Sequence, residues 1–502
     1  MESSAEISFF QAKNGSQVCS CKNIKLHSAY NPEKEGDRFA ETIAESFFPS
    51  AILVTEPALS YCKEGLHKKY PDAKLTCIRY SKKFSSTDKE WNKVFYFSNE
   101  TELENELFDF FGEEGILSCI FLSWQPSANV FPETNQKAWS AIKNAVTKST
   151  AVLSTRKYFA GRWLKNSVNF FSRVENISVI KKGSSPVIIA ASGRSLNSSL
   201  PFLKKNRSKF FLIAVSSAIQ PLLFNGITPD LCLSTDGGFW AKKHLELLLK
   251  PEHADIPLAL TSEANCPSKI LTSAPIIPLS YYDFPETDFF ENLGIPSLHA
   301  YRNGTVSGTA ALLAMEITSS HIYFCGLDMS ENPGFQHCQP NSLEICASLQ
   351  DFRLMPKSTR IAKTSLPSES MEIYRNWFSS QNDFFSQRIS RIADFSNFRF
   401  SNTLGKIKDV DWRDFSCEDN LILPKIEKMH KFSPKEKAIH RKKLCQRLET
   451  LEKSVQWLKN AFPVDFLNYS RTADTNKKNK LMSVLQQKNE NLLKDLKRLT
   501  NV

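Results

Sequence analysis

The sequence lacks a hydrophobic run long enough to cross a membrane. No apolar stretch reaches the roughly 18 residues that a spanning helix needs. The first residues, MESSAEISFF, hold an early glutamate and no basic segment ahead of an apolar one, so we expect no secretory signal. These two absences lead us to expect a cytoplasmic protein without a membrane span.

Several catalytic signatures are also missing. The absence of G-x-x-x-x-G-K-[ST] excludes a P-loop, and the absence of G-x-S-x-G and H-E-x-x-H disfavours hydrolases and zinc proteases. None of the strands predicted below is followed by a D-x-D pair, which would suggest a metal-bridged sugar nucleotide. We therefore expect no metal site and no required cofactor.

Cysteine usage and charge narrow the class further. The twelve cysteines are scattered, and the closest pair, Cys19 and Cys21, has neither zinc nor redox spacing, so we expect reduced thiols. Much of the net charge of +11 lies in C-terminal stretches such as 425–443 and 475–499, where Phe432 is the one aromatic residue among the charges. Without aromatic side chains to stack on bases, these runs favour solvated helical faces over a nucleic-acid partner.

The length of 502 residues exceeds what one core usually supports, so several domains are expected. Residues 1–150 are predicted to form a small α/β domain. Its expected strands are short apolar runs bounded by polar residues. They lie at 51–57, 75–80 and 116–124, with a helical pattern at 59–70 between the first two.

Residues 151–410 are predicted to form a Rossmann-like, sialyltransferase-like α/β domain, with a helical stretch around 141–171 near its start. Largely apolar runs are typical of parallel strands that helices cover on both faces. They occur at 187–191, 210–215, 230–235, 257–261, 275–279 and 321–326. Open sheets of this kind bind ligands just after their strands.

Residues 411–502 are predicted to form a helical region rich in Lys, Glu, Leu and Gln. The stretch 443–462 places Leu448, Leu451, Val455 and Leu458 on one helical stripe. A stripe of this kind usually packs against a neighbour, so we interpret the region as a helical appendage.

The clearest candidate ligand site is the turn in VIIAASGRSLNSSLPFL (187–203). Ser192, Gly193, Arg194 and Ser195 follow a buried strand and precede a helix expected to begin near residue 197. Backbone N–H groups in such a turn attract anions, and Gly193 lets the backbone approach a phosphate. An ordinary tight turn with a serine cap is an equal alternative.

Two further strand ends are predicted at the same edge of the sheet. Ser216 and Ser217 follow one strand, and Asp236 follows the next. The carboxylate of Asp236 could hold a ribose or a metal ion, or it could be the N-cap of the following helix. The segment NGITPD (225–230) is typical of a helix stop and a turn into a strand.

A second helix start suited to phosphate lies in YRNGTVSGTAALLAM (301–315). Thr305, Ser307 and Gly308 open a helix, and small residues with hydroxyls at a helix N-terminus suit an anion. The next strand leads to Asp328 and then to a loop that holds His337. A loop histidine at this edge could act as a general base, although an exposed histidine is more often plain polar surface.

The ordered set VIIAASGRSL, AVSSAIQPLLFNGITPDLCLSTDGG, NGTVSGTAALLAM and IYFCGLDMS resembles the Maf (motility-associated factor) family of flagellin glycosyltransferases. The same core is similar to archaeal 6-hydroxymethylpterin diphosphokinases (MptE-like) and to one class of bacterial sialyltransferases. The resemblance covers about residues 176–410. The segment LHSAYNPEKEGDRFAE (26–41) also resembles the family's N-terminal region.

The resemblance implies a transferase that moves a nonulosonic acid, such as pseudaminic or legionaminic acid, from its CMP-activated form onto Ser or Thr of flagellin. It implies catalytic roles for His337 as base and for Asp236. It implies nucleotide or phosphate contacts for Ser192, Gly193, Arg194, Ser195, Ser216, Ser217, Thr305, Ser307, Gly308 and Asp328.

The chain departs from the family pattern in two places. The usual Gly-x-Gly-Pro-Ser-Leu turn is Ala-Ser-Gly-Arg-Ser-Leu here (191–196), and Arg194 could either reach a phosphate or narrow the turn. The first domain has Thr55, Glu56 and Pro57 after its first strand instead of a glycine-rich turn. We therefore expect no nucleotide in that domain.

Two alternatives stay open. One is an ATP-dependent pterin diphosphokinase, which would need a magnesium ion held by Asp236 and Asp328. The other is a non-catalytic flagellin-binding protein, in which the basic C-terminal helices would contact the partner.

Overall fold

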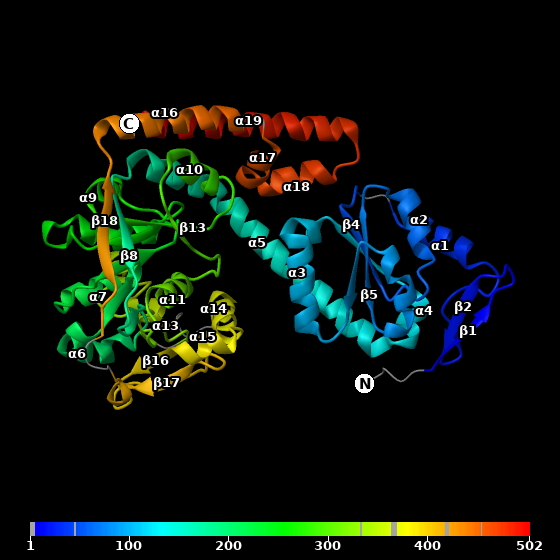
Figure 1. Cartoon of the computed structure of the whole chain (residues 1–502), viewed down its shortest axis with the longest axis horizontal. Helices are drawn as coiled ribbons and strands as arrows, with labels where there is room; N and C mark the ends of the chain where they lie inside the picture. Colours follow the sequence, from blue (N-terminus) through cyan, green and yellow to red (C-terminus); the bar gives the residue numbers. More distant parts are fainter. Residues whose placement is uncertain are drawn as a thin grey trace. The chain divides into compact units, whose positions relative to one another are not determined.

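The computed structural model describes residues 6–44, 47–331, 334–362, 369–416, 421–452 and 454–501. Its contacts divide the chain into two compact units (Figure 1). The first comprises Met1–Ala160 and Leu458–Glu490, and the second comprises Gly161–Trp457 and Asn491–Val502. The region 411–502, which the sequence analysis treats as one domain, contributes to both units.

The first unit is built on a four-stranded parallel sheet of order β6-β5-β4-β7, preceded by a three-stranded antiparallel sheet. Strand β4 is buried throughout because its apolar side chains face helices on both sides. The strands are β1 (Ile7–Gln11), β2 (Gln17–Cys21), β3 (Ile24–Lys25), β4 (Ala51–Thr55), β5 (Lys74–Arg79), β6 (Lys93–Tyr96) and β7 (Cys119–Ser123). The helices are α1 (Pro32–Glu41), α2 (Cys62–Lys69), α3 (Glu100–Leu117), α4 (Gln125–Val130), most of α17 (Val455–Ala461) and α18 (Pro463–Arg471), while α5 (Pro132–Arg173) and α19 (Thr475–Thr500) contribute to both units.

The loop after β4 is held by a buried ion pair. Arg79 lies 3.1 Å from the carboxylate of Glu56, and both side chains are fully buried. Glu56 and Ser60 adopt positive φ angles of 35° and 64°, which non-glycine residues keep only where the surroundings fix them. His27 accepts a hydrogen bond from the N–H of Leu59 at 2.9 Å. The N-terminal segment that resembles the family therefore holds this loop in place.

The second unit contains an eleven-stranded sheet of order β17-β16-β15-β9-β10-β11-β12-β13-β8-β18, with β14 paired to β13. Every pairing is parallel except that of β18 with β8. The strands are β8 (Asn176–Lys181), β9 (Val187–Ala190), β10 (Phe211–Val215), β11 (Leu231–Ser234), β12 (Leu258–Thr261), β13 (Ile276–Ser280), β14 (Leu298–His299), β15 (Ile322–Cys325), β16 (Ile389–Ala393), β17 (Lys408–Asp411) and β18 (Lys425–Lys431). The predicted α/β class is confirmed.

Helix α11 lies against the centre of this sheet, where it packs on β9, β10, β11 and β15. Its buried alanines, such as Ala310 and Ala314, let the helix approach the strands closely. The helices of this unit are α6 (Leu196–Lys205), α7 (Ile219–Phe224), α8 (Phe239–Leu245), α9 (Ser268–Ser273), α10 (Glu286–Leu293), α11 (Val306–Ile317), α12 (Ser342–Ser348), α13 (Lys357–Ala362), α14 (Glu369–Ser379), α15 (Asp383–Arg388) and α16 (Pro434–Leu451).

The C-terminal region is largely helical, as predicted, but it also contains strand β18, which runs beside β8 (Figure 1). Glu427 in this edge strand lies 2.6 Å from Lys181 and 3.2 Å from Lys425. Charged side chains, lysine above all, protect a sheet edge from further pairing. A lysine-rich segment can therefore be a strand, which the helical interpretation of this region overlooked.

The predicted helical stripe in this region is wrong at one position. Helix α16 ends at Leu451 and α17 begins at Val455, so the stripe does not lie on one continuous helix. Leu448 and Leu458 are buried as expected, whereas Val455 is 64% exposed. The break between the helices rotates Val455 away from the packing face.

Candidate functional site

Three loops with predicted site residues meet where the order of the sheet reverses. The chain passes from β9 to β10 on one side, while β15 pairs with β9 on the other. Open α/β sheets bind ligands at the carboxyl ends of their strands at such a point. The three loops carry Ser192–Ser195, then Ser216 and Ser217, and then Asp328. Ser216 is buried in a short 3-10 turn directly after β10.

The turn after β9 is closed onto the loop after β15. The N–H of Gly193 donates to the carbonyl oxygen of Gly326 at 2.8 Å. A Cβ at position 193 would lie 2.5 Å from that oxygen, so this approach requires glycine. Ser195 donates its N–H, at 3.0 Å, and its hydroxyl to the carboxylate of Asp328. Ser195 and Asp328 are buried, so they hold the turn, while Arg194 is exposed.

The loop that contains His337 covers this turn. The N–H of Cys338 donates to the carbonyl oxygen of Ser192 at 2.7 Å. The hydroxyl of Ser217 donates to that of Ser192 at 2.8 Å, and the side-chain amide of Asn341 donates to the carbonyl oxygen of Ser217 at 3.0 Å. These bonds bring His337, Ser192 and Ser217 into one place.

The surroundings of His337 favour a neutral imidazole. Burial lowers the pKa of His337, and Glu344 opposes the change. His244 of α8 is buried nearby, and burial, followed by the charge of His337, lowers the pKa of His244 to about 4. A neutral imidazole is the form that accepts a proton.

The N-terminus of α11 lies at the same edge of the sheet. The helix ends at Ile317 and the chain then enters β15 at Ile322, so the other end of α11 must lie near the carboxyl ends of the strands. Thr305 is the N-cap of the helix predicted here, and its hydroxyl accepts from the N–H of Ser307 at 3.3 Å. Ser307 and Gly308 are buried in the first turn. The helix thus directs its N–H groups toward the predicted nucleotide edge.

Asn303 has an unpaired donor beside this helix start. Its side-chain oxygen accepts from the N–H of Thr305 at 3.1 Å. Its Nδ2 has no hydrogen-bond partner among the residues that the structure describes, although Asn303 is only 7% exposed. A Cβ on Gly308 would lie 2.7 Å from that nitrogen and 2.9 Å from Trp377 of α14. Gly308 therefore allows Asn303 and Trp377 to approach the first turn.

Asp236 is exposed and does not serve as the N-cap of α8. Its carboxylate accepts from the N–H of Gly238 at 2.8 Å, and Gly238 itself is the N-cap. Tyr374 of α14 faces it: burial raises the pKa of Tyr374, and the charge of Asp236 raises it further. The ring of Tyr374 also lies 3.6 Å from where a Cβ on Gly304 would be. Tyr374 thus joins the loop of Asp236 to the start of α11.

A buried carboxyl group lies farther along the edge. Glu286 accepts from the hydroxyl of Ser262 at 2.6 Å and from the N–H of Tyr281 at 2.7 Å. Burial, and then the charge of Glu263, raise the pKa of Glu286 to about 7. Glu263 is held by both terminal nitrogens of Arg302, at 2.9 and 3.0 Å.

A D-x-D pair lies in β17, a strand that the sequence analysis did not predict. Asp409 and Asp411 lie at the end of β17. Asp409 binds the buried Arg391 at 2.7 and 2.9 Å, and Asp411 lies 2.7 Å from Arg413 and caps the next turn. Both carboxylates are already paired. Within the described ranges, no three His, Cys, Asp or Glu side chains form a group that could hold a metal ion.

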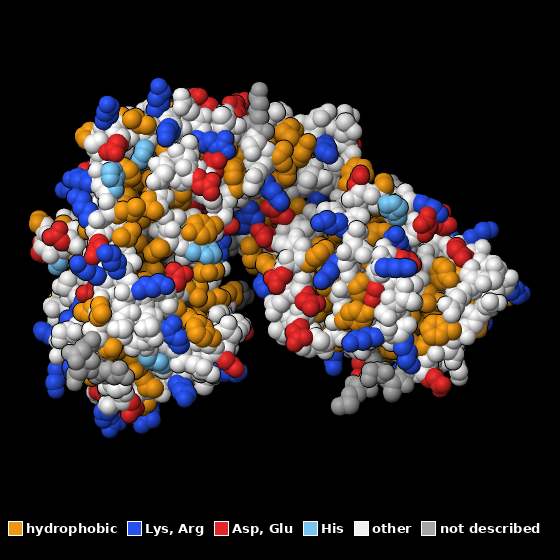
Figure 2. Space-filling view, in the orientation of Figure 1, with side chains coloured by type: hydrophobic (Ala, Val, Ile, Leu, Met, Phe, Trp, Pro, Cys, Tyr) orange, Lys and Arg blue, Asp and Glu red, His pale blue; other side chains and the backbone are white. Residues whose placement is uncertain are grey.

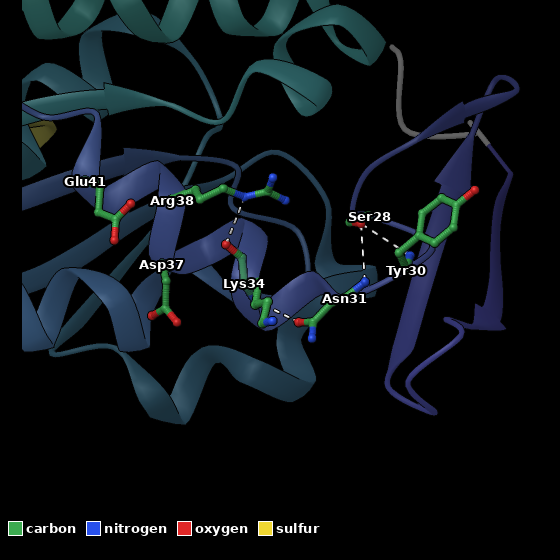
Figure 3. Close-up of a pocket in the computed structure, with 7 residues that line it drawn as sticks. All are labelled: Ser28, Tyr30, Asn31, Lys34, Asp37, Arg38 and Glu41. Atoms are coloured by element: carbon green, nitrogen blue, oxygen red, sulfur yellow. Dashed lines mark hydrogen bonds between the residues drawn. The ribbon is translucent and has the colours of Figure 1, made fainter.

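The first unit has a hollow of about 380 Å³ beside α1 (Figure 3). Its polar groups serve the start of the helix: Asn31 accepts from the N–H of Lys34 at 2.8 Å, and Ser28 accepts from the N–H groups of Tyr30 and Asn31. It is lined by α1 and the segment before it and by none of the predicted site residues, so we do not treat it as the candidate site. The lining residues are Ser28, Tyr30, Asn31, Lys34, Asp37, Arg38 and Glu41.

The sequence analysis missed Asn303, Tyr374, Glu286 and His244. Asn303 stands directly before Gly304 and Thr305, so its place in this motif could have indicated that it belongs to the site. Tyr374, Glu286 and His244 sit in helices with ordinary patterns, and their positions depend on how those helices pack. A sequence signal for them is lacking.

Charges of both signs are spread over the visible surface. Lys and Arg side chains are interspersed with acidic and neutral ones on the face shown in Figure 2.

None of the helices in the described ranges is long and apolar enough to cross a membrane. The eleven described cysteines are free thiols, and Cys417 lies outside the described residues.

Comparison with known proteins places the second unit in a family. Residues 161–334 match the family model described as 6-hydroxymethylpterin diphosphokinase MptE-like. An uncharacterized protein of Treponema pallidum (strain Nichols) is 30% identical over 339 residues, which are 66% of this chain and 73% of that protein. A second uncharacterized protein of the same strain is 24% identical over 225 residues, 42% of this chain and 37% of that protein.

A solved structure shares the fold of almost the whole chain. It is the MAf glycosyltransferase from Magnetospirillum magneticum AMB-1, with a TM-score of 0.54 and 10% sequence identity. The similarity covers 99% of this chain and 92% of that one. The likeness to that structure shows the shared fold, and the family model together with the Treponema relative identifies the chain as a member of the MptE-like family.

Proposed function

We propose that this chain is a glycosyltransferase that moves a nonulosonic, sialic-acid-like sugar from a CMP-activated donor onto Ser or Thr of flagellin. The observation that carries the proposal is the convergence of the turn after β9, the loop with His337 and the N-terminus of α11 at one edge of the sheet. The fold shared with the MAf glycosyltransferase supports the reaction class.

In the proposed reaction, His337 removes the proton from the acceptor hydroxyl. The acceptor oxygen then forms a bond to the anomeric carbon of the sugar, while the bond from that carbon to the phosphate oxygen breaks. CMP leaves with the bonding electrons. The N–H groups at the start of α11, near Thr305 and Ser307, stabilise the charge on the leaving phosphate, and the turn at Gly193 lies at the same edge of the sheet. The reaction needs no metal ion in this proposal.

A pterin diphosphokinase is the second candidate, because the family model that matches residues 161–334 carries that description. It would need carboxylates for magnesium. Asp236 is exposed, but Asp328 is buried and already accepts two hydrogen bonds from Ser195. This arrangement disfavours the metal site that the second candidate requires.

The double variant Thr305→Ala/Ser307→Ala tests the proposal. We expect turnover with a CMP-activated nonulosonic acid and flagellin to fall about tenfold or more, because the first turn of α11 would be less well ordered around the leaving phosphate. Release of CMP measures the rate, with and without a chelator.

Ser433→Ala provides the matched control. Ser433 is the N-cap of α16 and forms a capping box with Glu436, so its loss weakens a helix start by a similar amount, about 1 kcal/mol. Its turnover should equal that of the unmodified chain. Unchanged turnover in the Thr305/Ser307 variant, or loss of all activity on chelation, would argue against the proposal.

A further inference from the structure

Two stacked aromatic rings and a third, tilted one lie together on the surface beside the candidate site. The rings of Tyr282 and His299 lie parallel within 20° at a centroid distance of 4.7 Å, and His299 and Tyr301 lie 4.0 Å apart. Tyr282 is 53% exposed and Tyr301 is 44% exposed. We call these three residues the aromatic platform. Exposed rings that stack on one another leave apolar faces and polar edges open to a ligand.

The platform belongs to the carboxyl-end edge of the sheet. Tyr282 follows β13, and His299 is the last residue of β14, which pairs in parallel with β13 through Ser280 and His299. Both strands therefore point their ends at the ligand edge. Tyr301 stands four residues before the N-cap Thr305, so the two Cα atoms lie at most about 14 Å apart.

The backbone around the platform is fixed by several contacts. Tyr282 adopts a φ of +54°, a left-handed conformation that a tyrosine keeps only under constraint and that recurs at ligand sites. Its hydroxyl donates to the carbonyl oxygen of Ser297 at 3.3 Å. Arg302, next to Tyr301, binds Asp283 at 2.6 Å and lies 4.1 Å from the centre of the Tyr281 ring. The platform is therefore held ready before any ligand arrives.

We infer that the aromatic platform holds the pyranose ring of the sugar during transfer. This inference rests on the proposed function, because it places the sugar next to a phosphate bound at the N-terminus of α11. A pyranose has an apolar face of C–H groups and a rim of hydroxyls, which match the ring faces and the polar edges of Tyr and His. The short chain from Tyr301 to Thr305 suits a sugar that is bonded directly to that phosphate.

The test compares the affinities of CMP and of CMP-N-acetylneuraminic acid by calorimetry. Tyr301→Leu should weaken binding of the CMP-sugar about tenfold and leave CMP unchanged, since a ring contact of this kind is worth about one order of magnitude. Tyr301→Phe keeps the ring and should bind like the unmodified chain. Tyr158→Leu, which removes a ring that is 70% exposed on α5, is the off-site control. If Tyr301→Leu does not fold, Tyr282→Asn takes its place in the test, because asparagine tolerates the left-handed backbone at position 282.

The outcomes separate this inference from the proposed function. Equal losses for CMP and the CMP-sugar, or no loss for either, overturn the platform and leave the transferase proposal standing. If the unmodified chain binds no CMP, the proposed donor is wrong, and saturation-transfer NMR with methyl α-N-acetylneuraminide then decides the platform alone. A signal that Tyr301→Leu abolishes and Tyr301→Phe keeps supports it, and any other result overturns it.

Discussion

Single residues at the candidate site divide into those that hold the turn and those that face outward. Ser195 and Asp328 are hydrogen-bonded to each other, and position 193 must be glycine because no larger residue fits beside Gly326. The N–H groups of Gly193 and Ser195 already donate within the fold, so a ligand would meet the first turn of α11, with Arg194 at the surface. The ligand would therefore be recognised mainly by backbone, with few side chains.

Gly193→Ala should abolish CMP binding. The added Cβ would lie 2.5 Å from the carbonyl oxygen of Gly326 and 2.7 Å from the carboxylate of Asp328, so the turn must move. Calorimetric titration with CMP checks this. Gly161→Ala is the matched control, because a Cβ there meets nothing within 4 Å and alanine favours a helix interior by about 0.5–1 kcal/mol. Unchanged CMP affinity in Gly193→Ala would contradict the assigned role of the turn.

Glu286 makes the stability of the second unit depend on pH. Burial raises its pKa from the ordinary 4.5 to about 7. Between pH 4.5 and pH 7 the carboxyl group is therefore protonated in the folded state and ionised in the unfolded chain. Its contribution to stability is complete below pH 4.5 and is lost as the pH rises to about 7. The loss amounts to about 3 kcal/mol.

Glu286→Gln should remove that dependence. Urea unfolding at pH 5 and pH 8 measures the free energy of unfolding of the variant and of the unmodified chain. From pH 5 to pH 8 we expect the variant to gain about 3 kcal/mol in this free energy relative to the unmodified chain. Parallel pH profiles for the two proteins would show that the carboxyl group titrates normally.

Helices and strands of the central sheet were the best predicted part of the molecule. The six runs from 187 to 326 each became a strand, β9 to β13 and β15, because buried parallel strands are continuously apolar. Strands at the edges, such as β17 and β18, carry charges and could not be distinguished from helices or loops by composition. Site residues on turns were indicated by their glycines and hydroxyls, whereas Tyr374 and Glu286 depend on helix packing that a sequence pattern does not contain.

The break between α16 and α17 gives a test at the scale of elements. Leu448→Ala should lower the free energy of unfolding by about 2–5 kcal/mol, because Leu448 is fully buried. Val455→Ala should change it by at most about 0.5 kcal/mol, since the side chain is 64% exposed. Chemical denaturation of both variants decides between a broken and a continuous stripe. Similar losses for the two would contradict the break.

The whole molecule combines two α/β units that differ at corresponding places. After β4 the first unit has a loop held by the Glu56–Arg79 ion pair, with a positive φ at Glu56. The second unit has the glycine turn after β9 and the N-terminus of α11. Our proposal therefore places nucleotide binding in the second unit. Flagellin as acceptor and CMP as the nucleotide remain proposals.

Thermal unfolding with CMP, ATP and GTP, each with and without magnesium, tests the central claim most directly. A ligand at 100 times its Kd stabilises the folded state by about 2.7 kcal/mol, which raises the melting temperature by roughly 4 °C for a unit of this size. The account predicts that CMP gives this shift without magnesium. A shift with ATP and magnesium alone would point to the diphosphokinase, and no shift with any nucleotide would leave a non-catalytic flagellin-binding protein and contradict the account.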